Sequence, residues 1–145
     1  MRQVTSLLHV HTPGPGLMPI TDRVEAWFEA ERTDGGMLLT GMLTLLCQHT
    51  SASLTLQENA DPDVRSDLQA AFEGLAPPGG RERYAHASEG PDDMAAHIRT
   101  VLSGVHLSIP IIGGGLALGP WQGIYLWEHR ATGQHRKIAL HLLRD

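Results

Sequence analysis

Residues 47–63 (CQHTSASLTLQENADPD) bring together side chains that could do chemistry. Directly after the apolar run GMLTLL, this segment offers a thiol, the imidazole of His49, hydroxyls, amides and carboxylates. Neutral imidazole is the commonest metal ligand in proteins and the commonest general base near neutral pH. The segment therefore indicates a candidate metal or acid–base site at the end of an apolar strand.

Three histidines occupy comparable places on three separate predicted elements. The alternation along residues 42–50 puts His49 on the apolar face of a strand. On a predicted helix, His97 lies about 40° from Val101, at the margin of the apolar stripe. His129 shares a predicted strand face with aromatic residues. Imidazoles at the edges of buried surfaces could converge on one metal ion or one substrate.

The same residues also fit structural interpretations. A histidine at the edge of a core is more often a hydrogen-bonded structural residue than a ligand, and no HExxH-type spacing separates the two. Cys47, midway along an apolar face, is predicted to be a small buried hydrophobe rather than a nucleophile. Asp61 and Asp63 are the acids that a helix start favours. Spacing alone leaves both interpretations open.

The elements that must position these residues follow two periodicities. Helical spacing predicts helices over residues 20–32, with Thr21 as N-cap, from Asp61-Pro62 to residue 75, and from Pro91 to residue 103. Runs with strand character cover residues 3–11, 42–48, 52–58, 105–112, 123–130 and 135–143. The order is mixed and the last third is rich in strands, which predicts the α+β class.

Composition restricts the class of protein. A chain of 145 residues is expected to form a single domain over residues 1–145. One cysteine excludes an internal disulfide framework and suits a reducing compartment. The net charge of −5, without any Lys/Arg block, disfavours nucleic-acid binding. With no signal-peptide pattern and no apolar run of membrane-spanning length, the expected location is cytoplasmic, without membrane association.

Three longer motifs resemble the YjbQ family. They are HTSASLTLQENADPDVRSDL at 49–68, GPDDMAAHIRTVLSG at 90–104 and LSIPIIGGGLALGPWQGIYLWEHR at 107–130. The resemblance runs over nearly the whole chain in the right order. It implies a compact α+β domain with mixed or antiparallel, sandwich-like sheets and about three helices. It also implies a homotrimer and a secondary thiamine-phosphate synthase activity, which is ascribed to such proteins.

The resemblance implies functional residues at the positions that match these motifs. The expected catalytic set is His49, Glu58, Asp61, His129 and Arg130. The expected phosphate-binding set is Ser51, Ser53, Asn59 and Arg130. The expected metal ligands are His49, His86 and His97.

The implied reaction joins a pyrimidine methyl diphosphate to a thiazole phosphate and expels pyrophosphate. Such a catalyst must bind a small phosphorylated molecule, usually with a divalent cation and cationic or hydroxyl donors. Histidine ligands suit a zinc-like ion, whereas Mg²⁺ prefers oxygen ligands, so the metal's identity stays open. Two alternatives remain: a non-catalytic metal- or small-anion-binding protein that uses the same pocket, and a metal-dependent phosphate-ester hydrolase with a histidine-bound water.

The apolar pattern also predicts assembly. Residues 42–47 and 124–127 carry apolar side chains on both faces of their strands. A single layer of helices covers only one face of a sheet, so a neighbouring subunit is expected to cover the other. Together with the resemblance, this predicts a homotrimer with the histidine cleft near a subunit boundary.

Overall fold

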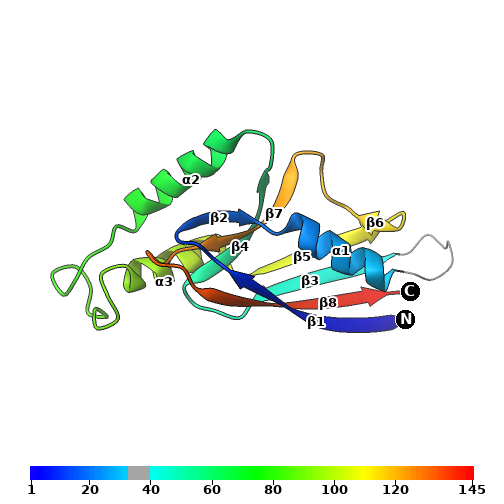
Figure 1. Cartoon of the computed structure of the whole chain (residues 1–145), viewed down its shortest axis with the longest axis horizontal. Coiled ribbons are helices and arrows are strands. Elements are labelled where there is room, and N and C mark those ends of the chain that lie inside the picture. The colour runs from blue at the N-terminus through cyan, green and yellow to red at the C-terminus, as the bar shows by residue number, and fades with distance from the viewer. Residues whose placement is uncertain (33–39) are drawn as a thin grey trace.

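The computed structural model describes residues 1–32 and 40–145, and shows helices and strands segregated as in the α+β class (Figure 1). The elements are β1 (Arg2–His11), β2 (Gly16–Pro19), α1 (Thr21–Glu31), β3 (Gly41–Cys47), β4 (Ala52–Glu58), α2 (Pro62–Leu75), α3 (Asp93–Ser103), β5 (His106–Ile112), β6 (Gly115–Leu116), β7 (Gln122–Glu128) and β8 (His135–Arg144). The predicted class is confirmed. The short strands β2 and β6 were not predicted, because a few residues are too short to show a periodicity.

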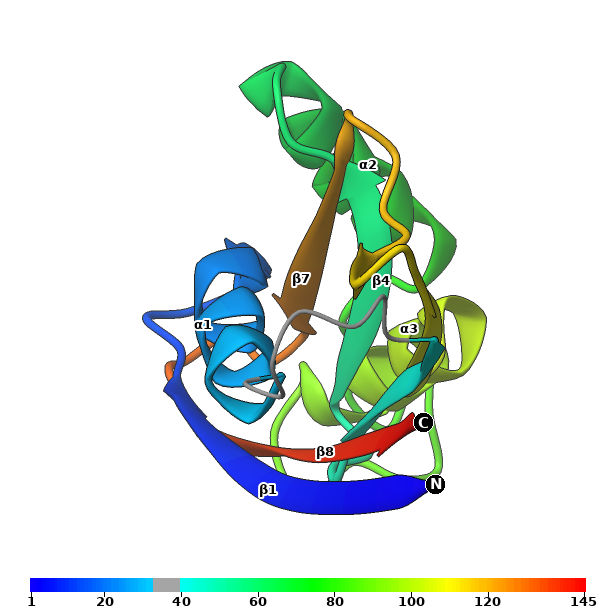
Figure 2. The same ribbon diagram turned by 90° about the vertical axis from the view of Figure 1, so that its right-hand side faces the viewer.

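The strands form two antiparallel sheets, in the orders β1-β8-β3-β5-β6 and β2-β7-β4. Figure 2 shows β4 and β7 rising steeply above the sheet that contains β1 and β8, with α1 in the angle between them. Val24 of α1 belongs to the same buried cluster as Leu45 of β3 and Leu126 of β7. The two sheets and α1 therefore share one core.

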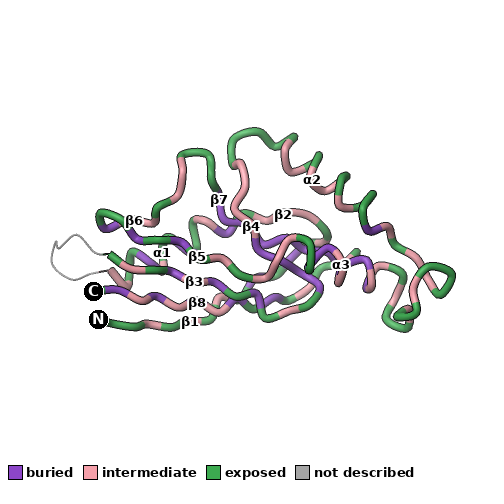
Figure 3. Tube along the Cα trace, turned by 180° about the vertical axis from the view of Figure 1, so that it is seen from behind, coloured by how far each residue is buried: buried purple, intermediate pink, exposed green. Residues whose placement is uncertain are grey.

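The core follows the alternation along the strands. Leu43, Leu45 and Cys47 of β3 are buried on one face, as predicted. Ile138 and Leu140 of β8, which pairs with β3, are buried on the same side. Each such side chain contributes about 1.5–3 kcal/mol when fully buried. Figure 3 shows buried stretches in β3, β4, β7 and β8.

The helix starts differ in how they are capped. As predicted, Asp61 caps α2, which begins at Pro62: the Oδ1 atom of Asp61 accepts a hydrogen bond of 2.9 Å from the backbone N–H of Asp63. The prediction that Thr21 caps α1 is wrong: Thr21 is the first helical residue. Its hydroxyl accepts a hydrogen bond of 2.9 Å from the backbone N–H of Ile124 in β7, so it joins the helix to the sheet instead of capping it.

Helix α3 begins two residues later than predicted and buries a different face. Its buried residues include Asp93, Ala96 and Thr100, whereas Val101 and Leu102 are 83% and 56% exposed. The predicted apolar stripe through Val101 is therefore wrong. Helix α3 packs against β4, and its buried residues are small, polar or charged and not large and apolar.

The second face of β7 is covered within the chain. Trp127 stacks on Phe72 of α2 with ring centroids 4.2 Å apart, and its indole N–H donates to Gln69 at 2.8 Å. The argument that β7 needs a neighbouring subunit therefore fails. On β3, Met42 and Leu46 remain partly exposed, and the homotrimer stays a prediction. No helix in the described part of the chain is long and apolar enough to cross a bilayer.

Candidate metal centre

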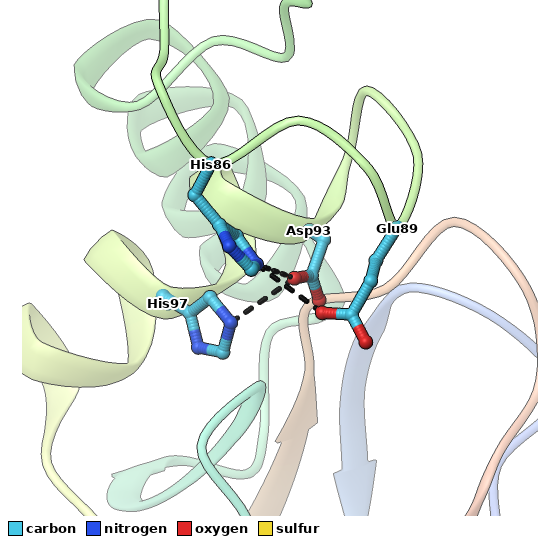
Figure 4. Close-up of side chains that lie close together, drawn as sticks. All are labelled: His86, Glu89, Asp93 and His97. Atoms are coloured by element: carbon cyan, nitrogen blue, oxygen red, sulfur yellow. Dashed lines mark hydrogen bonds and ion pairs between the residues drawn. The ribbon is translucent and has the colours of Figure 1, made fainter.

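Two histidines and two carboxylates converge beside α3 (Figure 4). The Nε2 atom of His86 lies 2.7 Å from Oδ2 of Asp93 and 3.2 Å from Oε2 of Glu89. The Nε2 atom of His97 lies 3.1 Å from the same Oδ2 atom of Asp93. One ligand atom from each of the four residues lies within 4.8 Å of all the others. This is a donor set of the kind that binds a divalent metal ion.

Local structure explains why these residues meet. Asp93 and His97 are four residues apart on α3, so they lie on the same helix face, one turn apart. His86 and Glu89 precede the helix in a loop that turns back at Gly90, which has a φ of +106°. That φ favours glycine, because other residues rarely adopt it. The loop thereby brings His86 and Glu89 back over the first turn of α3.

Arg130, just after β7, fixes the carboxylate of Asp93. Its Nη1 atom lies 3.0 Å from Oδ1 of Asp93, and its Nε atom donates to Asp92 at 2.8 Å. Its Nη2 atom donates to the backbone carbonyl of Glu89 at 2.9 Å. Because Arg130 takes one oxygen of Asp93, the other is directed at the two histidines. An outer partner of this kind orients a metal ligand.

His97 is held between two hydrogen-bond acceptors. Its Nδ1 atom lies 2.8 Å from the carbonyl oxygen of Thr50, so we assign the Nδ1 proton to this bond. Its Nε2 atom faces the carboxylate of Asp93, which also only accepts when ionised. Both neighbours are satisfied by a doubly protonated ring, or by a cation between Nε2 and the carboxylate. A fixed Nδ1–H···O=C bond is typical of metal-binding histidines.

Electrostatics keep Asp93 ionised. Burial raises the pKa of Asp93, but the hydrogen bond from His86 and the positive charges of His97 and Arg130 together bring it below its ordinary value. The hydrogen bond to Asp93 in turn raises the pKa of His86. Asp93 is only 3% exposed, so it presents a negative charge from within the protein surface. A metal ion would supply a further positive charge beside this carboxylate.

A cavity of about 550 Å³ adjoins this group through His97. Its lining residues are His49, Thr50, His97, Thr100, Val101, Gly104, Val105 and His106. None of these is an acid, a lysine or an arginine. The hydroxyl of Thr100 is buried and has no hydrogen-bond partner among the described residues. The cavity thus offers a space without acids, lysines or arginines, and the Thr100 hydroxyl itself is not exposed to it.

The structure brings two of the three predicted metal ligands into the group. His86 and His97 meet there, with ring centroids 5.5 Å apart. His49 lies outside the group, but it lines the adjoining cavity. Its Nε2 atom accepts a hydrogen bond of 2.8 Å from the backbone N–H of Lys137, and burial lowers the pKa of His49.

Asp93 and Glu89 were missed by the sequence reasoning. The signal available was the spacing of four residues between Asp93 and His97 on a predicted helix. That spacing is common on exposed helix faces, where it carries no metal. What distinguishes Asp93 is its burial and its pairing with Arg130, and both depend on residues far along the chain.

His129 and the two predicted serines belong to a buried network. The Nε2 atom of His129 lies 2.8 Å from Oγ of Ser53, while its Nδ1 atom is buried with no partner among the described residues. Burial, with the charges of Arg99 and Arg136, lowers the pKa of His129 to about 3, so the ring is neutral. The hydroxyl of Ser51 accepts a hydrogen bond of 3.0 Å from Arg136.

Glu58, Asn59 and Asp61 lie at the opposite end of β4 from Thr50. A strand of this length spans about 20 Å. Asn59 lines a separate cavity of about 400 Å³, and Asp61 caps α2. The structure therefore does not bring the predicted phosphate-binding residues Ser51, Ser53, Asn59 and Arg130 to one place. Arg130 is engaged by Asp92 and Asp93.

Comparisons with known proteins agree on one family. The model of the family described as UPF0047 protein YjbQ-like matches residues 6–145. A UPF0047 protein of Synechocystis sp. is 43% identical over 97% of this chain and 92% of its own length. The UPF0047 protein YjbQ of Salmonella typhimurium is 52% identical over 68% of this chain and 70% of its own length.

Solved structures share the fold. A hypothetical protein of Aeropyrum pernix matches with a TM-score of 0.84 at 27% identity, over 97% of this chain and 98% of that chain. A conserved hypothetical protein of Thermus thermophilus matches with a TM-score of 0.79 at 37% identity, over 95% of this chain and 99% of that chain.

Proposed function

Because the chain belongs to the UPF0047 YjbQ-like family and brings His86, Asp93 and His97 to one point, we propose that it binds a zinc-like divalent metal ion there. The observation that carries this proposal is the position of His97 between two acceptors, the carbonyl of Thr50 and the carboxylate of Asp93. A metal ion on Nε2 satisfies the carboxylate and leaves the bond to Thr50 intact.

The distances suit such an ion. Zinc binds imidazole nitrogen and carboxylate oxygen at about 2.0–2.2 Å, so two tetrahedral ligands lie about 3.3 Å apart. The Nε2 atoms of His97 and His86 lie 3.1 and 2.7 Å from Oδ2 of Asp93. The distances from these two Nε2 atoms to Oδ2 of Asp93 need to grow by less than about 1 Å to admit the ion. Two imidazoles favour zinc over Mg²⁺, which prefers oxygen ligands.

The ligand count favours a catalytic site over a purely structural one. His86, Asp93 and His97 supply three ligands and leave one position for water or substrate, as in catalytic zinc sites. Glu89, more than half exposed at the rim, is the remaining acid, and it is free to leave the ion or to act on a bound water. A bound zinc-like ion supplies a Lewis acid and an acidified water.

The reaction that fits this arrangement is hydrolysis of a small phosphate ester. The phosphate would bind at the centre formed by His86, Asp93 and His97, and the uncharged organic part would occupy the cavity beyond His97. Thr100, His49 and His106 line that cavity. The thiamine-phosphate synthase activity rests on the family resemblance alone, since the phosphate-binding set it needs does not gather beside the metal group.

A homotrimer remains part of this proposal. The exposed apolar residues Leu46, Val101 and Leu102 lie on β3 and α3, and Val101 also lines the cavity. A neighbouring subunit over these residues would bury them and close the cavity. Light scattering should then report about three times the chain mass of 15.8 kDa, and a stable monomer at micromolar concentration would remove this part.

The function is tested by activity with and without metal. Protein loaded with Zn²⁺ should hydrolyse p-nitrophenyl phosphate, lose this activity to a chelator and regain it on adding Zn²⁺. His106→Ala at the cavity wall should raise KM without changing zinc binding, whereas the control His141→Ala on β8 should change neither. Stoichiometric zinc without hydrolysis of any phosphate ester would leave a non-catalytic metal-binding protein. Pyrophosphate release from the two thiamine precursors would establish the synthase instead.

A further inference from the structure

A second group of imidazoles lies on the five-stranded sheet, on residues that the centre above does not use. His9 and His11 are on β1, and His135 is the first residue of β8. The Nδ1 atom of His9 lies 2.9 Å from Nε2 of His135. The ring of His11 stacks on that of His135 with centroids 4.4 Å apart. All three side chains are exposed.

The strand register fixes this arrangement. His11 is the direct cross-strand partner of His135, and His9 is two residues earlier on the same strand. Residues two apart on a strand point to the same face, so all three rings project from one face. Val10 and Arg136, on the other face, are buried and hold that face against the protein.

Hydrogen bonds make the frame beneath the three rings rigid. Just beyond His11, the backbone N–H of Thr12 donates to Gln134, and that of Gln134 donates back to the Thr12 hydroxyl, each at 2.8 Å. The same hydroxyl donates to the buried carboxylate of Glu128 at 2.8 Å. On the other side, Arg23 donates to the carbonyl of His9 at 2.6 Å. The backbone of β1 and β8 beneath the three imidazoles is therefore already fixed before a ligand binds.

We propose that His9, His11 and His135 form a second metal site, with nitrogen ligands only, for Cu²⁺ or Zn²⁺. Two nitrogens on one tetrahedral ion lie about 3.3 Å apart, so the pair at 2.9 Å opens by only about 0.4 Å. His11 is stacked on His135, and among the described residues only the group beside α3 has three or more donor atoms within 4.8 Å of one another. His11 therefore leaves the stack, by rotation of its exposed side chain, to become the third ligand. A metal would also clamp β1, the edge strand, to β8.

The surroundings select the kind of ion. Lys137, two residues after His135, projects from the same face of β8 and brings a positive charge. Neither an acid nor a carbonyl oxygen belongs to this ligand set, so Mg²⁺ and Ca²⁺ lack the oxygen ligands they need. Imidazole binds Cu²⁺ and Zn²⁺ through directed bonds, and Cu²⁺ is the tightest of the divalent series. The order of affinity at this site is Cu²⁺ above Zn²⁺, with no binding of Mg²⁺.

The experiment uses the full chain carrying His97→Ala, so that the first centre is disabled. This protein should bind about one Cu²⁺ or Zn²⁺ per chain in equilibrium dialysis at micromolar ion. Adding His9→Ala, His11→Ala or His135→Ala should each weaken binding by at least about tenfold. The matched control is His141→Ala, which removes a histidine of the same strand that pairs with Gln3, and it should bind as the parent does. The Cu²⁺ electron paramagnetic resonance spectrum should show nitrogen hyperfine structure.

Several results would overturn this inference. They are binding only at millimolar ion, equal binding by the His135→Ala and His141→Ala variants, or a Cu²⁺ spectrum without nitrogen coupling. Far-UV circular dichroism checks folding, and three separate single variants prevent one misfolded protein from deciding the outcome. Failure here leaves the first centre untouched, because zinc binding by the native chain that is lost with His97→Ala reports on that centre alone.

Discussion

The Nε2 atom of His97 faces Oδ2 of Asp93 at 3.1 Å, while its Nδ1 atom faces the carbonyl oxygen of Thr50 at 2.8 Å. The side chain of His97 thus connects α3 to the segment that leads into β4, and its Nε2 atom points to the buried carboxylate of Asp93. Arg130 holds the second oxygen of that acid at 3.0 Å. In this geometry Asp93 and His97 are ligands already in position, and the predictions below depend on it.

Asp93→Asn should abolish tight zinc binding at the centre formed by His86, Asp93 and His97. The amide keeps the shape of the side chain but removes the negative charge that both histidines and Arg130 share. The zinc dissociation constant, measured by competition with a chromophoric chelator, should rise by about 100-fold or more. Asp67→Asn, an exposed acid on α2, is the matched control and should bind as the native chain does. Equal affinities for the two variants would place the metal elsewhere.

Zinc affinity should rise with pH through the titration of His86. Because the hydrogen bond to Asp93 raises the pKa of His86 above its ordinary value of 6.5, protons compete with zinc up to a pH above that value. Calorimetric titrations at a series of pH values should show this dependence, and it should flatten in His86→Ala. A pH-independent affinity across this range would exclude His86 as a ligand.

Without metal, the contribution of His86 to the stability of the protein falls as the pH rises, whereas its contribution to zinc affinity rises. The raised pKa of His86 means that its contribution is complete below pH 6.5 and is lost as the pH rises through the higher folded pKa. The lowered pKa of Asp93 means that its contribution is present above its ordinary value of 3.8 and is lost as the pH falls through the lower folded pKa. Zinc should therefore stabilise the chain most at the alkaline side, where the His86–Asp93 pair is weakest. Thermal unfolding at a series of pH values, with and without Zn²⁺, measures this difference.

Asp61→Ala should destabilise the protein without affecting the metal. Its carboxylate caps α2 through the hydrogen bond to the N–H of Asp63, and loss of such a cap costs about 1 kcal/mol. Urea denaturation measures this change, and zinc titration should give the native affinity. A large loss of phosphate-ester hydrolysis with little loss of stability would instead assign Asp61 to a substrate site.

Cys47 should be inert towards thiol reagents in the folded protein. Burial raises the pKa of its thiol to about 11, and Sγ lies 3.6 Å from the carbonyl oxygen of Ala52, to which it donates. Both effects deplete the reactive thiolate. Ellman's reagent should react slowly with native protein and fully in denaturant. Rapid stoichiometric reaction of the native protein would contradict the burial of this side chain.

The sequence predicted those features that depend on neighbours along the chain. Alternation located the buried side of β3, including Cys47, and the Asp61-Pro62 pair located the start of α2. These signals are local, since a strand face or a helix cap is determined by residues a few positions apart. The placement of His97 relied on an apolar stripe through Val101, and that stripe is wrong, because Val101 is 83% exposed.

The rest of the site depends on contacts between distant residues. Asp93 is buried because Arg130, which follows β7, lies against the start of α3. Val101 is exposed because α3 packs through its small and polar residues, which no apolar periodicity reveals. His49 is held in the cavity wall because its Nε2 atom accepts a hydrogen bond from the backbone N–H of Lys137 in β8. These partners are far apart along the chain, so the spacing of nearby residues does not predict them.

The central claim is that His86, Asp93 and His97 hold one metal ion, and anomalous diffraction at the zinc edge tests it most directly. Crystals of the native chain, grown without chelator and with equimolar Zn²⁺, should show an anomalous peak about 2.0–2.2 Å from Nε2 of His86, Oδ2 of Asp93 and Nε2 of His97. The account would be contradicted by a zinc-loaded crystal with no peak at this point, in which both histidines still bond directly to Asp93.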